Sequence, residues 1–303
     1  MKTLREILID ANERHVAVGH FNISDLGALK AIVAAGRGMN LPLLIGVSEG
    51  EREFVGVKQA AALIKSIRDE YDYPIFLNAD HTHSLDKVKE AAEAGFDEII
   101  FDNSSLPMDE NIANTKAAVA AIRAINPNII IEGEIGYIGS NSEVIDKAPE
   151  GIALSTPEEA VRFVKETGID VLAPAVGNMH GLLKTMTAPG ADGEVAHKHL
   201  NIDRIATIKA SIDAAVMGDP AHGPMFMTLH GGSGTEDADF TAAAHAGMTI
   251  IHVSSELRLA WRRGVEDGLK NLEEIAPYKL VAPAVAAIQK IVENRLKLFN
   301  GLV

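Results

Sequence analysis

The feature that most constrains this sequence is a regular alternation of short apolar runs with segments of helical periodicity along the whole chain. The apolar runs are typical of buried strands, and they cover residues 16–21, 42–47, 74–79, 98–102, 129–134, 170–176, 225–229 and 248–253. Helical spacing of apolar residues is clear in residues 24–37, 85–94, 157–167, 202–215 and 256–268. This alternation predicts an α/β fold with parallel strands.

The number of strand-helix units favours one architecture. Eight units without a linker predict closure into a (β/α)₈ TIM barrel, with extra helices at the termini and a single domain over residues 1–303. An open, doubly wound sheet is the alternative. Helix starts agree with the assignment: Ser24 and Ser84 stand at cap positions, and Ser155-Thr156-Pro157 combines a cap with a first-turn proline.

Composition and charge exclude several classes of protein. None of the 303 residues is cysteine, so disulfides and thiolate-bound zinc are excluded. A formal net charge of -14 argues against nucleic acids and anionic membranes as partners. Residues 1–8 read as an amphipathic helix and not as a signal peptide, and no apolar run reaches the roughly 18 residues of a membrane span. We therefore expect a cytoplasmic protein.

Three histidines, His81, His180 and His230, each follow a predicted strand. In a parallel barrel these positions converge at the C-terminal mouth, and three histidine ligands leave one coordination position of a metal free. Asp80 immediately precedes His81, so that one of the two can bind metal while the other moves a proton. This pattern predicts an open, catalytic metal site.

A glycine-rich turn follows the seventh predicted strand, with the sequence Gly231-Gly232-Ser233-Gly234. Its backbone N–H groups could hold a phosphate, although such a turn in isolation is more often only a turn. The position favours phosphate, because barrels frequently bind it with the loops after strands seven and eight, where Ser254 and Ser255 also lie. Lys184 could add positive charge.

Carboxylates end the fourth and fifth predicted strands. We expect Glu132 and Glu134 to alternate across the fifth strand, so that only Glu134 faces the mouth. Asp102 could be an alternative metal ligand or could orient a histidine; the alternative is a salt-bridged pair of strand-end acids. Long loops at 137–155 and 183–200 are typical of lids or substrate clamps. We place five further histidines in loops or helices and His83 in a loop, and we assign no role to any of them; the five are His20, His197, His199, His222 and His245.

Nearly the whole chain resembles the class II, metal-dependent ketose-bisphosphate aldolases, which include fructose-1,6-bisphosphate and tagatose-1,6-bisphosphate aldolases. The motifs that carry the resemblance are Phe21-Asn22-Ile23-Ser24, Asn78-Ala79-Asp80-His81-Thr82-His83-Ser84, Glu132-Gly133-Glu134-Ile135-Gly136, Val176-Gly177-Asn178-Met179-His180-Gly181, Leu229-His230-Gly231-Gly232-Ser233-Gly234 and Val253-Ser254-Ser255-Glu256-Leu257.

The resemblance implies reversible cleavage of a phosphorylated ketose into dihydroxyacetone phosphate and an aldehyde by a homo-oligomer, a dimer or tetramer. It implies one catalytic Zn²⁺ per subunit on the three histidines, an alternative buried metal position at Glu134 and Asp102, and a monovalent cation near the phosphate. Asp80 would shuttle the proton of the aldehyde-side oxygen. The substrate would be bound by Gly181, Lys184, Gly231, Gly232, Ser233, His252, Ser254, Ser255 and, at the distal phosphate, Arg258.

The chain departs from the family pattern at three places. His252 stands where the family has an asparagine that contacts the enediolate, and Leu183 replaces a tyrosine. In residues 139–143 the first acid is shifted by one position. Two alternatives therefore remain open: a barrel hydrolase in which the metal activates water, and an aldolase homologue that has been repurposed to another substrate.

Overall fold

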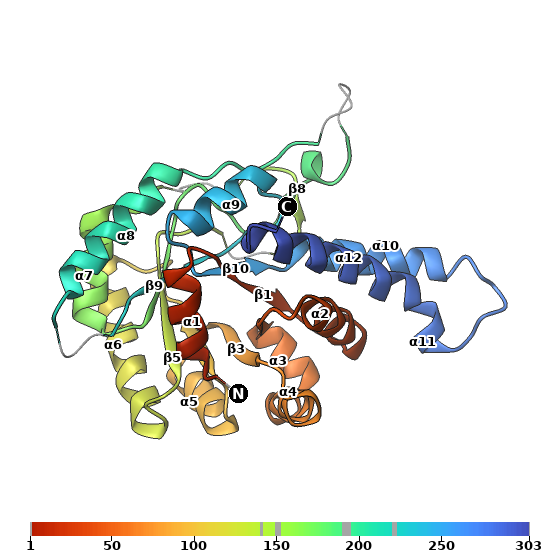
Figure 1. Cartoon of the computed structure of the whole chain (residues 1–303), viewed down its shortest axis with the longest axis horizontal. Coiled ribbons are helices and arrows are strands. Elements are labelled where there is room, and N and C mark those ends of the chain that lie inside the picture. Colours follow the sequence, from red (N-terminus) through yellow and green to blue (C-terminus); the bar gives the residue numbers. More distant parts are fainter. Residues whose placement is uncertain (1, 140–141, 149–152, 190–194, 220–222, 303) are drawn as a thin grey trace.

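The computed structural model describes residues 2–139, 142–148, 153–189, 195–219 and 223–302. Its parallel strands form a closed barrel in the order β1-β10-β9-β7-β5-β4-β3-β2, with helices around the outside (Figure 1). The predicted (β/α)₈ barrel is confirmed, and the alternative of an open sheet is wrong because β1 pairs with both β2 and β10.

Each barrel strand overlaps one of the predicted apolar runs. They are β1 (Val18–Asn22), β2 (Leu43–Val47), β3 (Ile75–Thr82), β4 (Glu98–Phe101), β5 (Ile130–Ile135), β7 (Val171–Pro174), β9 (Phe226–Leu229) and β10 (Ile250–Val253). Nearly every strand residue is buried, because helices cover the outer face while side chains fill the interior. Strand β3 extends beyond its predicted end, to Thr82.

The helices are α1 (Leu4–Glu13), α2 (Leu26–Met39), α3 (Glu49–Val55), α4 (Val57–Tyr71), α5 (Leu85–Ala94), α6 (Met108–Ile125), α7 (Pro157–Thr167), α8 (Ile202–Val216), α9 (Asp237–His245), α10 (Ser255–Gly268), α11 (Pro277–Leu280) and α12 (Ala282–Phe299). Helix α12 packs against α2 and α10, and α10, α11 and α12 extend away from the barrel (Figure 1). In the described ranges no helix is both long and apolar enough to cross a membrane.

The helix starts follow the predicted capping residues with one exception. Ser84 caps α5, and Thr156 forms a capping box with Glu159 before α7. Helix α2 is capped by Asp25 and not by Ser24: its carboxylate accepts from the N–H groups of Gly27 and Ala28. The prediction for Ser24 was therefore wrong by one residue.

Helix α1 closes the N-terminal end of the barrel. Leu4, Ile7 and Leu8 pack onto apolar side chains from the first half of the strands, among them Phe76 and Phe226. This closed, apolar end leaves the opposite end of the strands as the place for a site.

The two long loops meet each other beside the barrel mouth. Residues Val144–Ile145 (β6) and Leu182–Leu183 (β8) form a separate parallel pair. Parts of the two predicted loops, residues 140–141, 149–152 and 190–194, and also His222 lie outside the described residues. The described parts of the two loops are therefore joined next to His180.

Candidate active site

A bulge at the end of β3 brings Asp80 and His81 to the mouth together. The register with β4 shifts between Ala79 and Thr82, and His81 has a φ of 39°, a conformation that non-glycine residues rarely adopt. Buried Arg52 holds the bulge: Nη1 donates to the carbonyl of Asp80 at 3.1 Å, and Nη2 donates to Thr82 Oγ1 at 3.0 Å. Two consecutive side chains can thus both face the site.

The three predicted metal ligands lie together. Ring centroids of His81 and His180 are 4.7 Å apart, those of His81 and His230 4.8 Å, and those of His180 and His230 6.0 Å. One nitrogen of each ring lies within 4.8 Å of the others, so the set can hold one divalent ion. Burial holds the pKa of His180 well below its ordinary value, which keeps it neutral as a ligand must be.

Both glutamates of β5 face the barrel interior, which corrects the prediction for Glu132. Glu132 Oε1 lies 2.5 Å from Nε2 of His230, and Glu134 Oε2 lies 2.9 Å from Nδ1 of the same ring. Residues i and i+2 of a strand share a face, so the two acids cannot alternate. Burial by itself lowers the pKa of His230. The two carboxylates outweigh burial and raise this pKa well above its ordinary value.

Asp102, after β4, orients His81. Its Oδ2 lies 2.8 Å from His81 Nδ1, and its other oxygen accepts from the backbone and hydroxyl of Ser104. Burial by itself lowers the pKa of His81, but Asp80 and Asp102 outweigh it and raise this pKa to about 9. His81, Asp102 and Glu134 form a second group that could hold a metal.

Asp80 has one oxygen held and one oxygen free. Asn22 Nδ2 donates to Oδ2 at 2.8 Å, whereas buried Oδ1 has no hydrogen-bond partner among the described residues. Burial favours the neutral acid, yet His81, His20 and His230 outweigh it and hold the pKa of Asp80 below the ordinary range. The result is an ionised carboxylate with a free acceptor beside the histidines.

His252 on β10 stacks on His20 of β1 inside the barrel. Their ring centroids are 3.5 Å apart with an interplanar angle of 5°. Gly46 makes room for this pair, because a Cβ there would lie 2.1 Å from the His20 ring. His20 is therefore a buried strand residue next to the site and not a loop residue, and its pKa is lowered to about 4, mainly by burial.

The glycine-rich turn lies against the start of α10. Gly231 has a φ of 59°, and a Cβ there would lie 2.3 Å from the Met179 carbonyl oxygen. Ser233 Oγ accepts from the N–H groups of Ser254 and Glu256, both at 3.2 Å. Gly181, Gly231, Ser233, His252, Ser254 and Ser255 line one small cavity together with Asp80, His81 and His180.

The structure places Lys198, which was not predicted, at this turn, whereas Lys184 is exposed and forms an ion pair. Lys184 follows β8 in a 3₁₀ turn that leads outward, where its Nζ lies 2.6 Å from Asp146 and its side chain is 68% exposed. Lys198, from the same long loop, is 5% exposed and donates to backbone carbonyls beside the histidines. Burial lowers the pKa of Lys198 to about 7.

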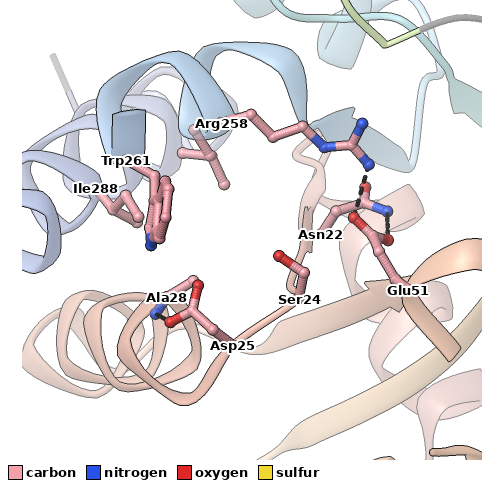
Figure 2. Close-up of a pocket in the computed structure, with 9 residues that line it drawn as sticks. Asn22, Ser24, Asp25, Ala28, Glu51, Arg258, Trp261 and Ile288 are labelled. Carbon is pink, nitrogen blue, oxygen red and sulfur yellow. Dashed lines mark hydrogen bonds and ion pairs between the residues drawn. The ribbon is translucent and has the colours of Figure 1, made fainter. Parts of the chain in front are cut away.

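Arg258, on the first turn of α10, borders the mouth on the side of β1. Its Nη2 donates to Glu51 Oε1 at 2.7 Å, and Glu51 in turn accepts from Asn22 (Figure 2). Arg258 lines a cavity of about 320 Å³ that also contains Asp80. Figure 2 shows it on the same helix as Trp261, beside a neighbouring pocket. Arg258 thus lines both cavities.

Sequence reasoning missed Glu132, His20, Arg52 and Lys198. Strict two-residue periodicity would have found Glu132, since it shares a face with Glu134, and would have placed His20 inside the barrel. Arg52 and Lys198 carry no comparable signal, because their partners include backbone carbonyls of other segments.

Comparisons with known proteins agree with the geometry. A family model described as fructose-bisphosphate aldolase class-II matches residues 2–301. The fructose-bisphosphate aldolase of Staphylococcus aureus (strain Mu50 / ATCC 700699) is 32% identical over 302 residues, which are 98% of this chain and 96% of that protein.

Solved structures show the same fold. The YdjI aldolase from Escherichia coli K12 has a TM-score of 0.77 at 24% identity, with 98% of this chain and 96% of that chain covered. The fructose-bisphosphate aldolase from Campylobacter jejuni has a TM-score of 0.78 at 19% identity, with 98% and 94% covered. The chain therefore belongs to the class-II fructose-bisphosphate aldolase family and is an aldolase, a carbon–carbon lyase.

Proposed function

We propose that this aldolase is zinc-dependent and reversibly cleaves fructose 1,6-bisphosphate, or a related phosphorylated ketose, into dihydroxyacetone phosphate and an aldehyde. The observation that carries the proposal is the convergence of three elements at one barrel mouth. They are the three-histidine set, the free oxygen of Asp80 and the glycine-rich turn beside α10. Aldol cleavage of a phosphorylated ketose needs an electrophile, a proton acceptor and an anchor for phosphate.

His81, His180 and His230 would hold one divalent ion per subunit, with Asp102 and Glu134 as the alternative position. An ion held there would supply Lewis-acid chemistry for the ketose carbonyl, in place of the Schiff base that a lysine aldolase uses. Asp102 on Nδ1 of His81 leaves Nε2 of that ring to face the ion.

Asp80 would accept the proton of the C4 hydroxyl during cleavage and return it to the aldehyde oxygen during synthesis. Its geometry suits this role, because Asn22 restrains Oδ2 while Oδ1 is free to receive a proton. Its lowered pKa means that the carboxylate is ionised before substrate arrives.

The substrate phosphate would lie against Gly181, residues 231–233, Ser254 and Ser255, where the first turn of α10 adds the positive end of a helix dipole. His252 would contact the ketose, and Arg258 would reach the distal phosphate. Lys184, whose exposed ammonium group pairs with Asp146, would add positive charge for the bound phosphate.

We further propose that the chain acts as one barrel domain within a cytoplasmic homo-oligomer. Leu272, Ile275 and Tyr278, in the segment from α10 to α11, are 88%, 86% and 74% exposed. Large apolar side chains clustered on a projecting segment are typical of a protein interface. Replacing Leu272 and Ile275 by glutamate should shift the assembly, a dimer or tetramer, toward the monomer in sedimentation experiments.

The decisive experiment is Asp80→Asn, compared with Asp86→Asn at the exposed start of α5 as a control. We expect Asp80→Asn to keep its zinc and to lose carbon–carbon cleavage by a factor of about 10² or more, as for other positioned acid–base groups. Asp86→Asn should retain both. Dihydroxyacetone phosphate release from fructose and tagatose bisphosphates is the measurement.

Two results would favour the alternatives. Ester or amide hydrolysis by the zinc-loaded protein, without ketose cleavage, would indicate a hydrolase. Stoichiometric zinc without either activity would indicate an aldolase homologue with another substrate.

A further inference from the structure

Lys198 ties the loop after β7 to the loop after β9. Its Nζ donates to the backbone carbonyls of Met179 at 2.7 Å, Gly181 at 2.8 Å and Gly231 at 3.0 Å. The carbonyls of Met179 and Gly181 belong to the two neighbours of His180, and Gly231 directly follows His230. Three carbonyl oxygens from two loops therefore converge on one buried nitrogen.

The backbone of Lys198 holds the side chain in this position. Its N–H donates to the carbonyl of Gly234 at 2.8 Å, and its own carbonyl accepts from the N–H of Glu236 at 3.0 Å. A parallel bridge to Thr235 completes the attachment. The lysine is thus anchored along the glycine-rich turn from residue 231 to residue 236.

The set of partners defines the chemistry of the position. All three contacts of Nζ are acceptors, and a lysine nitrogen has three N–H bonds to donate only when it is protonated. The three carbonyls therefore favour the charged form, which burial by itself opposes. Converging backbone carbonyls without a carboxylate are also the ligands that replace the water shell of K⁺. The partners of Nζ are therefore those that a dissolved monovalent cation would use.

We propose that the Lys198 ammonium is a built-in monovalent cation, which holds the loops of His180 and His230 in register and makes the site independent of dissolved K⁺ or Na⁺. Without a positive charge, the carbonyls of Met179, Gly181 and Gly231 would point at one another. Lys198 is a positioning residue, since it acts on the site through the two loops. The inference deepens the proposed function and rests on it for the activity measurement alone.

The test compares Lys198→Ala, which leaves the carbonyls in place and opens space, with Lys198→Met, which fills much of that space without charge. Lys209→Ala is the matched control, because Lys209 is also largely buried and donates to a carbonyl, that of Met225, but lies on α8. Ketose cleavage and thermal unfolding are measured at equal ionic strength in KCl, NaCl, NH₄Cl and tetramethylammonium chloride. Tetramethylammonium is too large for the position and cannot donate a hydrogen bond.

For the wild type and for Lys209→Ala, we expect the rate of ketose cleavage and the melting temperature to be the same in all four salts. In tetramethylammonium, Lys198→Ala should unfold at a lower temperature and lose cleavage roughly tenfold or more, as for buried acceptors left without a donor. K⁺, Na⁺ or NH₄⁺ should restore both. Lys198→Met should show the same losses without restoration by any cation.

A wild type that needs K⁺ or Na⁺ for its rate or melting temperature would overturn the proposal. So would a folded Lys198→Ala that responds equally to all four salts, or a Lys198→Met with wild-type properties in tetramethylammonium. If Lys198→Ala folds in none of the salts, Lys198→Met still decides the question. Melting temperatures need no substrate, so an inactive wild type would count against the proposed function alone.

Discussion

The two ends of the barrel are built from the same strands and have opposite character. At the N-terminal end, apolar side chains such as Leu44, Phe76 and Phe226 pack against α1. At the C-terminal mouth the buried side chains are polar, and several of their atoms have no partner in the described part of the chain, including Asp80 Oδ1 and His252 Nε2. Each buried polar atom without a partner costs about 1–3 kcal/mol. The polar mouth therefore lowers the stability of the fold, and burial of apolar side chains at the N-terminal end offsets this loss.

The change in character can be followed along single strands. Along β9 and just beyond its end, every second residue is Phe226, Thr228 and His230. The hydroxyl of Thr228, midway in this series, already has no hydrogen-bond partner among the described residues. Barrel interiors are normally filled by branched apolar side chains. Polar side chains that face inward near the C-terminal ends of the strands therefore indicate function in this fold. Replacements at each end of the barrel can test whether stability and function are separated in this way.

The largest effect is expected for His180→Ala at the mouth. Zinc content and ketose cleavage should fall together, because two imidazoles remain of the three that would hold the metal. His197→Ala, at a half-exposed histidine that lies near Glu236, is the control and should retain both. Metal analysis and cleavage assays are the measurements, and stoichiometric zinc in a variant that lacks all three histidines would disprove the assignment.

Phe76→Ala should have the next largest effect, at the opposite end. Loss of this buried ring should lower the free energy of unfolding by about 3–5 kcal/mol. Zinc stoichiometry and KM should stay at wild-type values under native conditions, because the ring lies in the layer beneath α1. Denaturant unfolding and steady-state kinetics would measure the two quantities, and a parallel rise in KM would show that the ends are coupled.

A smaller effect is expected for the pH dependence of metal binding. A ligand histidine must lose its proton, so the raised pKa of His81, about 9, should make affinity increase with pH well beyond 6.5. In the metal-free protein the same shift contributes stability that is complete below pH 6.5 and is lost as the pH rises through 9.

Asp102→Asn removes one cause of this shift. The slope of log affinity against pH between 6.5 and 9 should therefore be shallower in the variant than in the wild type, as measured by chelator competition. Equal slopes would mean that Asp102 does not set the proton affinity of His81.

The smallest effect is expected for His252→Asn. The replacement removes a stacked, titratable ring beside Asp80 and should change the ranking of fructose, tagatose and monophosphorylated ketoses, together with the pH profile. Parallel assays of both proteins measure this. If ranking and profile are unchanged, His252 has no special role in substrate choice.

Residues next to strand ends could be placed from the sequence. His81, His180, His230 and Asp80 were predicted together because parallel strands end at one face of a barrel. Glu132 was missed through an error in applying the strand period and not through lack of information. The ion pair of Lys184 with Asp146 could not be predicted in the same way, because the pairing of β6 with β8 joins two loops that are distant in sequence.

The sequence by itself determined the barrel, its apolar strands and the convergence of His81, His180 and His230, because each depends on local periodicity and on chain adjacency. Tertiary structure alone decided which atoms meet: Arg52 on the carbonyl of Asp80, His20 on the ring of His252, and Lys198 beneath the two loops. These contacts join segments distant along the chain, and the first and last use backbone carbonyls, which are the same in every residue. Residue type therefore cannot reveal them before the chain has folded.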